Sequence, residues 1–64
     1  MNTIKVTHLD KNNKPLDNGF IASLPEYKAV NKGFDWDLII TTILNSGEYV
    51  TSNLAYGNIR FSFK

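Results

Sequence analysis

The middle of the chain reads FDWDLIITTILNSG from Phe34 to Gly47, an apolar segment of helical length with polar residues at both ends. Asp35 suits the N-cap of a helix, and Asp37 then lies in the first turn, where the helix dipole favours negative charge. The triplet Asn45-Ser46-Gly47 is a helix stop signal. The β-branched run inside the segment has strand propensity, but the end signals favour a helix.

The segments on both sides of this helix alternate between apolar and polar residues, which is the pattern of half-buried strands. Turn signals rich in Asn, Asp, Gly and Pro separate the two strands of each pair. Pro25 is interpreted as the end of the second strand, and residues 26–33 could form either a helical turn or an ordered connection. The expected strands cover residues 3–9, 19–24, 48–54 and 59–63.

We therefore predict an α+β fold for residues 1–64: a single domain in the order ββαββ, with one helix packed on a four-stranded, mainly antiparallel sheet. The apolar positions of the helix recur on one stripe, which would cover one face of the sheet. The predicted core is formed by Ile4, Val6, Phe20, Ala22, Leu24, Trp36, Ile39, Ile40, Ile43, Leu44, Val50, Leu54, Ile59, Phe61 and Phe63.

The small size limits the stability that this core can supply, because a chain of about 60 residues buries only about 60% of its unfolded surface. The 64 residues include no cysteine and one histidine, His8, so disulfides, thiolate zinc sites and histidine-rich metal sites are excluded. Association with a protein partner, or with further copies as a homodimer or higher oligomer, is the remaining common way to add stability.

The overall charge is nearly balanced, with seven basic and six acidic side chains. Proteins that bind nucleic acid usually carry a clear basic excess. No apolar run reaches the roughly 18 residues of a membrane span, and the sequence after Met1 lacks a signal-peptide pattern. We expect a complete chain that resides in the cytoplasm.

Candidate catalytic and metal-binding residues have structural explanations. Asp35 and Asp37 could contribute to a magnesium site, but helix capping accounts for both. His8 falls on the apolar side of its strand, as a residue at the core edge would. The turn that starts at Asp10 resembles a calcium loop but has Pro15 and Ile21 where such a loop requires Gly and Glu. We expect no enzyme activity, no cofactor and no metal.

Three apolar residues are expected outside the core. Leu38 lies off the helix stripe, and Leu9 and Ile21 lie on the outward side of their strands. The last strand is also expected to form an unpaired edge, which invites pairing with another chain. These features predict a protein–protein interaction module that uses Leu9, Ile21 and Leu38.

A nucleic-acid-binding protein is the alternative. The sheet face opposite the helix is expected to present cations, hydroxyl groups and one aromatic ring, which could contact phosphates and stack on bases. The residues that would carry this function are Lys5, Tyr49, Arg60 and Lys64.

The amino-acid composition indicates the kind of genome that encodes the protein. Lysine outnumbers arginine six to one, and Asn and Ile are abundant. These residues have AT-rich codons, as in low-GC bacterial and phage genomes. We expect a phage or mobile-element protein that inhibits a host enzyme or defence system.

Overall fold

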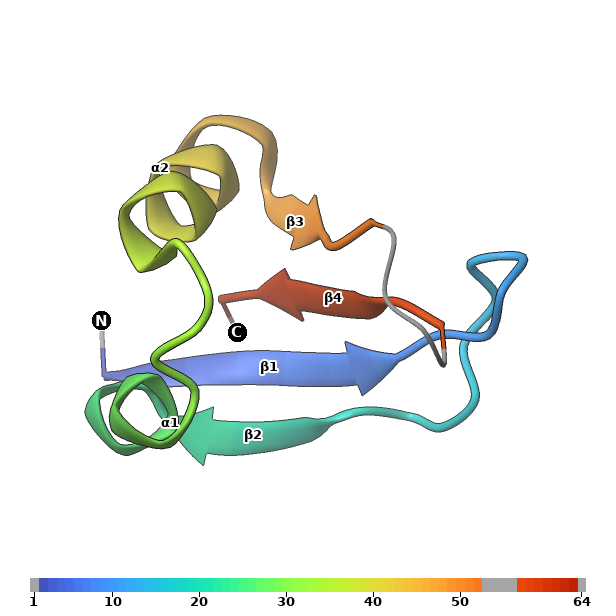
Figure 1. The fold of residues 1–64 in the computed structure, drawn as a ribbon, viewed down its shortest axis with the longest axis horizontal. Coiled ribbons are helices and arrows are strands. Elements are labelled where there is room, and N and C mark those ends of the chain that lie inside the picture. Colours follow the sequence, from blue (N-terminus) through green and yellow to red (C-terminus); the bar gives the residue numbers. More distant parts are fainter. Residues whose placement is uncertain (1, 53–56, 64) are drawn as a thin grey trace.

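Four strands form one antiparallel sheet in the order β2-β1-β4-β3, and two helices accompany it (Figure 1). The computed structural model describes residues 2–52 and 57–63. The elements in chain order are β1 (Thr3–His8), β2 (Phe20–Ser23), α1 (Leu24–Val30), α2 (Trp36–Ser46), β3 (Glu48–Val50) and β4 (Ile59–Ser62).

Helix α2 has the ends that the sequence predicts. The Asp35 side chain is the N-cap and accepts a hydrogen bond of 3.2 Å from the backbone N–H of Leu38. Gly47 is the C-cap, and its backbone N–H donates to the Ile43 carbonyl at 2.8 Å. Its φ of 91° is left-handed, a conformation that glycine adopts without the steric cost that a Cβ would add.

The prediction of a single helix is wrong, because α1 forms a second one. Ser23 ends β2 and is also the N-cap residue of α1, so the strand passes directly into the helix. Pro25 lies in the first turn of α1, where a missing backbone N–H costs nothing, and Glu26 follows with favourable charge. The proline that we interpreted as the end of a strand is the start of a helix.

Both helices pack on the same face of the sheet. Val6 and Phe61, on neighbouring strands, have no exposed surface and lie under this helical layer. The Phe61 ring centroid lies 5.3 Å from that of Trp36 in α2 and 6.0 Å from that of Tyr27 in α1. A cluster of edge-to-face rings therefore joins both helices to the centre of the sheet.

The predicted core is correct for its centre and wrong at several positions. Phe20 is 44% exposed and Leu44 is 62% exposed. In β3 the expected orientation is inverted, because Tyr49 pairs with Phe61 and faces the helices, whereas Val50 lies on the opposite face. A shift of one residue reverses every side chain of a strand, and β3 has only three residues with which to set its register. Leu54 lies outside the described residues.

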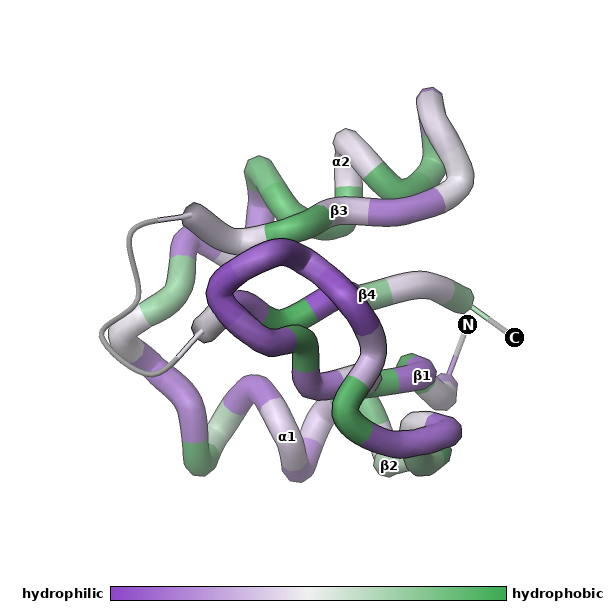
Figure 2. Tube along the Cα trace, turned by 90° about the vertical axis from the view of Figure 1, so that its right-hand side faces the viewer, coloured by the Kyte–Doolittle hydropathy of each residue, from purple (hydrophilic) through white to green (hydrophobic). Residues whose placement is uncertain are grey.

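The connection between β1 and β2 has a largely hydrophilic tip (Figure 2). Within it, the Asp10 carboxylate accepts hydrogen bonds from the backbone N–H groups of Asn12 and Lys14 at 2.8 and 3.0 Å. Leu9 extends the pairing of β1, because it forms a bridge with Pro15 and exchanges backbone hydrogen bonds with Asn58. Leu9 is consequently 1% exposed, and our expectation that it lies on the surface is wrong.

The edges of the sheet also differ from the expectation. The last strand, β4, lies between β1 and β3 and is paired on both sides. Strands β2 and β3 are the two edges. The unpaired edge that could receive another chain is therefore not at the C-terminal strand.

Candidate functional site

A described concavity lies between edge strand β2 and helix α1. It has a volume of about 430 Å³ and is lined by residues 20–23 together with Glu26, Tyr27, Val30 and Asn31. We call this concavity the β2 groove. The groove lies where β2 passes into α1 without a loop, so that residues of both elements line it.

The β2 groove has large apolar side chains at its surface. Phe20 is 44% exposed, Ile21 is 53% exposed and Val30 is 82% exposed. Single exposed apolar residues are common on protein surfaces, but exposed apolar residues that line a concavity indicate a candidate site for a ligand or partner. Phe20 and Ile21 are consecutive in β2, so their side chains point to opposite faces of the sheet, and Val30 belongs to α1.

The backbone of β2 also has hydrogen-bonding groups that its own sheet does not use. The Leu24 N–H donates to the Asn2 carbonyl, and in an antiparallel ladder the paired residues alternate with unpaired ones. Phe20 and Ala22 therefore bond to β1, whereas Ile21 directs its N–H and C=O to the free edge. The Ser23 N–H points the same way, and its carbonyl is taken up by the first turn of α1.

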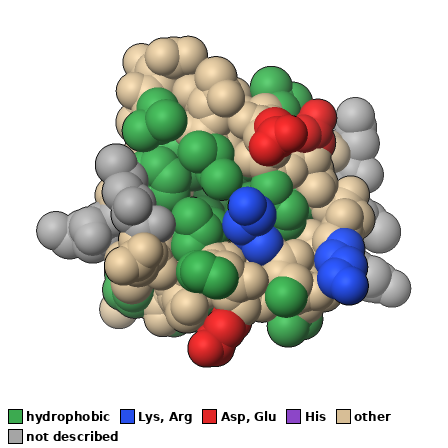
Figure 3. Space-filling view, turned by 90° about the vertical axis from the view of Figure 1, so that its left-hand side faces the viewer, with side chains coloured by type: hydrophobic (Ala, Val, Ile, Leu, Met, Phe, Trp, Pro, Cys, Tyr) green, Lys and Arg blue, Asp and Glu red, His purple; other side chains and the backbone are tan. Residues whose placement is uncertain are grey.

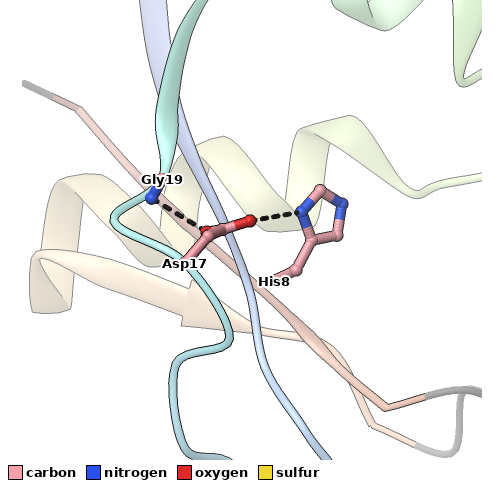
Figure 4. A network of polar contacts seen from close by, with 3 residues as sticks. All are labelled: His8, Asp17 and Gly19. Atoms are coloured by element: carbon pink, nitrogen blue, oxygen red, sulfur yellow. Dashed lines mark hydrogen bonds and ion pairs between the residues drawn. The ribbon is translucent and has the colours of Figure 1, made fainter.

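Polar contacts fix the start of β2 (Figure 4). The Asp17 carboxylate accepts a 2.8 Å hydrogen bond from the Gly19 N–H, and its other oxygen lies 3.4 Å from Nδ1 of His8. The Gly19 N–H, and to a lesser extent His8, lower the pKa of the Asp17 carboxyl group. The centroid of the His8 ring lies 6.0 Å from that of the Phe20 ring. The contact between Asp17 and His8 is therefore next to Phe20, the first residue of β2 that lines the groove.

The polar atoms on the helical side of the groove are partly committed to the fold. The Asn31 side-chain amide donates to the Tyr27 carbonyl at 3.0 Å, and the Asn31 carbonyl accepts from the Trp36 indole at 2.8 Å. Burial raises the pKa of Tyr27 further above neutral pH, where a tyrosine hydroxyl is already protonated. Glu26 is the one charged residue that lines the groove.

A second concavity, of about 320 Å³, is lined by Leu24, Ile40, Leu44 and Phe63. Figure 3 looks onto the end of the molecule where the two helices lie and shows hydrophobic side chains gathered there. The described residues that line this concavity are all apolar, and none of them belongs to edge strand β2 or β3. It therefore lacks the directional groups that would select a ligand.

The predicted partner-binding residues do not form one surface. Ile21 lines the β2 groove, as its expected exposure suggested. Leu38 is 50% exposed but lies on α2, in the lining of neither concavity. The groove was not predicted because α1 was not recognised from the sequence. Its signal is the sequence Ser23, Pro25 and Glu26, which is typical of the start of a helix.

The residues predicted for nucleic-acid binding are divided between the two faces of the sheet. Lys5 and Arg60 lie on the face away from the helices. The Nε atom of Arg60 is 3.5 Å from a Glu48 carboxylate oxygen, an ion pair that offsets part of the positive charge. Tyr49 lies on the helix-covered face, so its expected place beside these cations is wrong. Lys64 lies outside the described residues.

Residues 2–52 and 57–63 contain no group of three metal-ligating side chains, and neither described helix could cross a membrane. Comparison with protein-family models, with curated proteins and with solved structures gives no match to this chain.

Proposed function

We propose that this protein is a non-catalytic protein–protein interaction module that adds an extended segment of a partner to edge strand β2. The observation that carries this proposal is the combination of free backbone groups at Ile21 and Ser23 with an apolar groove beside them. Main-chain pairing supplies affinity in such complexes, and pockets for alternate side chains supply specificity.

The available contacts suit a modest but selective interaction. Each backbone hydrogen bond adds about 0.5–1.5 kcal/mol, and β2 has three free groups to pair. Exposed Phe20 and Val30 add apolar area that a bound segment would remove from water. No enzymatic step is part of the proposal.

The biological setting that we propose is the cytoplasm of a bacterial host, with the protein acting as a phage or mobile-element inhibitor. An inhibitor that occupies a surface needs only a binding edge on a small stable body. The lysine, asparagine and isoleucine bias is the support for this setting. Self-association through β2 is the homodimeric form of the same interaction.

Selection from a random-peptide display library tests the proposal. The wild-type protein is expected to enrich extended apolar peptides, and Ile21→Pro is expected to lose them because proline removes a free donor of the edge. Val50→Pro is the matched control at edge β3. There the Thr51 N–H donates to Ile59, so by the same alternation the Val50 N–H points outward.

Two results would contradict the proposal. One is equal enrichment by wild type and Ile21→Pro, which would place peptide binding elsewhere. The other is no peptide enrichment together with salt-sensitive retention of the wild type on single-stranded nucleic acid, which would favour the alternative function through Lys5 and Arg60.

A further inference from the structure

We infer that the β2 groove accepts a basic residue: the bound segment places an arginine or lysine against Glu26, between apolar neighbours in its own sequence. This inference rests on the proposed function and specifies the chemistry of its occupant. Three features of the groove support it: a carboxylate without an ion-pair partner among the described residues, an aromatic wall and the alternation of side chains along a strand.

Glu26 supplies the charge of the groove, and the first turn of α1 is a position where the helix dipole favours it. It is exposed, lines the groove, and within the described part of the chain forms no ion pair. Lys28 is two residues away on the same helix, and side chains at that spacing point in different directions. Lys5 pairs with Ile21 and so belongs to the opposite face of the sheet. A partner cation would therefore meet no competing cation from these neighbours.

The aromatic walls of the groove suit both the aliphatic part and the charged group of a long basic side chain. The Phe20 and Tyr27 rings have centroids 6.5 Å apart and an interplanar angle of 55°. Arginine and lysine lay their aliphatic stems along apolar surface and bring their charge over aromatic faces. Arginine fits best, because its planar guanidinium can stack on a ring while it donates two hydrogen bonds to a carboxylate.

Strand geometry sets what lies beside the basic residue. A segment paired with Ile21 directs alternate side chains to the two faces of the sheet. The basic residue faces the helical side, so its two neighbours in sequence face the side of Ile21 and Lys5. Ile21 is half-exposed there and Lys5 repels cations. The favoured pattern is thus apolar, basic, apolar.

This chemistry favours another protein over a second copy of the chain as the occupant. Strand β2 itself contains no basic residue between Phe20 and Ser23. A symmetric β2–β2 dimer would therefore bring no strand cation to Glu26. A second copy becomes an outcome of the test rather than the proposed occupant.

The test begins with the sequences enriched in the display selection. We expect Arg or Lys at one position between two apolar residues. A synthetic peptide with that sequence is expected to bind wild type about 10-fold more tightly than Glu26→Gln, a difference of about 1.4 kcal/mol. Glu48→Gln removes a carboxylate at the β3 edge and is expected to leave the affinity unchanged. Circular dichroism checks that both variants are folded.

Charge reversal provides the specific readout. Glu26→Lys is expected to reject the basic peptide and to bind the same peptide with Glu at the basic position. The inference is overturned, with the proposed function intact, if peptides that require Ile21 show no basic enrichment or bind Glu26→Gln as tightly as wild type. It is also overturned if light scattering shows a stable dimer that Ile21→Pro converts to monomer and that excludes the peptide. If neither wild type nor Val50→Pro selects any peptide, both proposals fail.

Discussion

The two edges of the sheet have different chemistry. Strand β3 has three residues and carries Glu48, whose side chain is 52% exposed and forms an ion pair with Arg60. Strand β2 has no charged residue, exposes Ile21 and borders an apolar groove. Proteins protect edges from pairing with short strands and charges. One edge of this sheet has that protection and the other lacks it.

This difference shows that the unprotected edge at β2 requires a functional explanation. An unprotected apolar edge is an aggregation hazard. In this fold α1 lies directly beside it and adds side chains that restrict what can bind. The contrast between β2 and β3 therefore supports the proposal that β2 is a binding edge.

The largest effect is expected for Trp36→Ala, which would break the core that supports both edges. Trp36 is 8% exposed, contacts the rings of Tyr27, Phe34 and Phe61, and donates to the Asn31 carbonyl. Its truncation is expected to cost about 3–5 kcal/mol, enough to abolish the cooperative thermal transition of so small a domain.

The control for this substitution is Leu44→Ala on the same helix. Leu44 is 62% exposed, so its truncation is expected to change the melting temperature little. Equal melting temperatures for Trp36→Ala and wild type would show that the ring cluster does not hold the fold together.

An intermediate effect is expected at the glycines that precede the two edge strands. Gly19 has φ of 79°, and a Cβ there would lie 2.6 Å from Oγ1 of Thr7. Gly47 has φ of 91° but open space around it. Gly19→Ala is expected to cost about 3 kcal/mol, the upper end of local backbone strain, and Gly47→Ala about 1 kcal/mol.

Urea denaturation of both variants measures this difference. Gly19→Ala should also weaken peptide binding, because it displaces the start of β2, whereas Gly47→Ala should not. A smaller loss of stability for Gly19→Ala than for Gly47→Ala would contradict the crowding at the β2 entry.

The smallest effect is expected for Asp17→Asn, which removes the acceptor of the Gly19 N–H and the partner of His8. The pKa of Asp17 is lower in the folded state than in the unfolded state. The ionised carboxylate therefore stabilises the fold at pH values above the unfolded-state pKa, and this stabilisation is lost as the pH falls through the folded-state pKa. The melting temperature of Asp17→Asn should be slightly below wild type at pH 7. The gap should shrink below about pH 4; a constant gap across this range would exclude an ionic contribution.

Sequence reasoning succeeded where local signals decide the structure. Asp35 and Gly47 mark the ends of α2 because caps depend on a few adjacent residues, and β4 has a regular alternation around Phe61. It failed where the signal was ambiguous or distant. Pro25 can follow a strand or open a helix, and only the packing of α1 on β2 distinguishes the two. The edges depend on the pairing of β1 with β4, whose paired residues lie 51 to 57 positions apart in sequence.

The candidate site shows the same division. Alternation along β2 placed Ile21 on the surface, and the structure agrees. Leu9 follows the same alternation but is covered by pairing beyond the end of β1, which no local pattern records. The role of Glu26 in the groove depends on α1 and was therefore out of reach of the strand patterns.

The edge-to-face contact between Tyr27 and Trp36, with ring centroids 5.8 Å apart, gives the molecule a built-in optical reporter. Trp36 is the one tryptophan of the chain, so selective excitation at long ultraviolet wavelengths observes this site alone. Tyr27 touches the indole on one side and lines the β2 groove on the other. An occupant that shifts Tyr27 should therefore change the emission of Trp36, and its arrival can be timed in unlabelled protein.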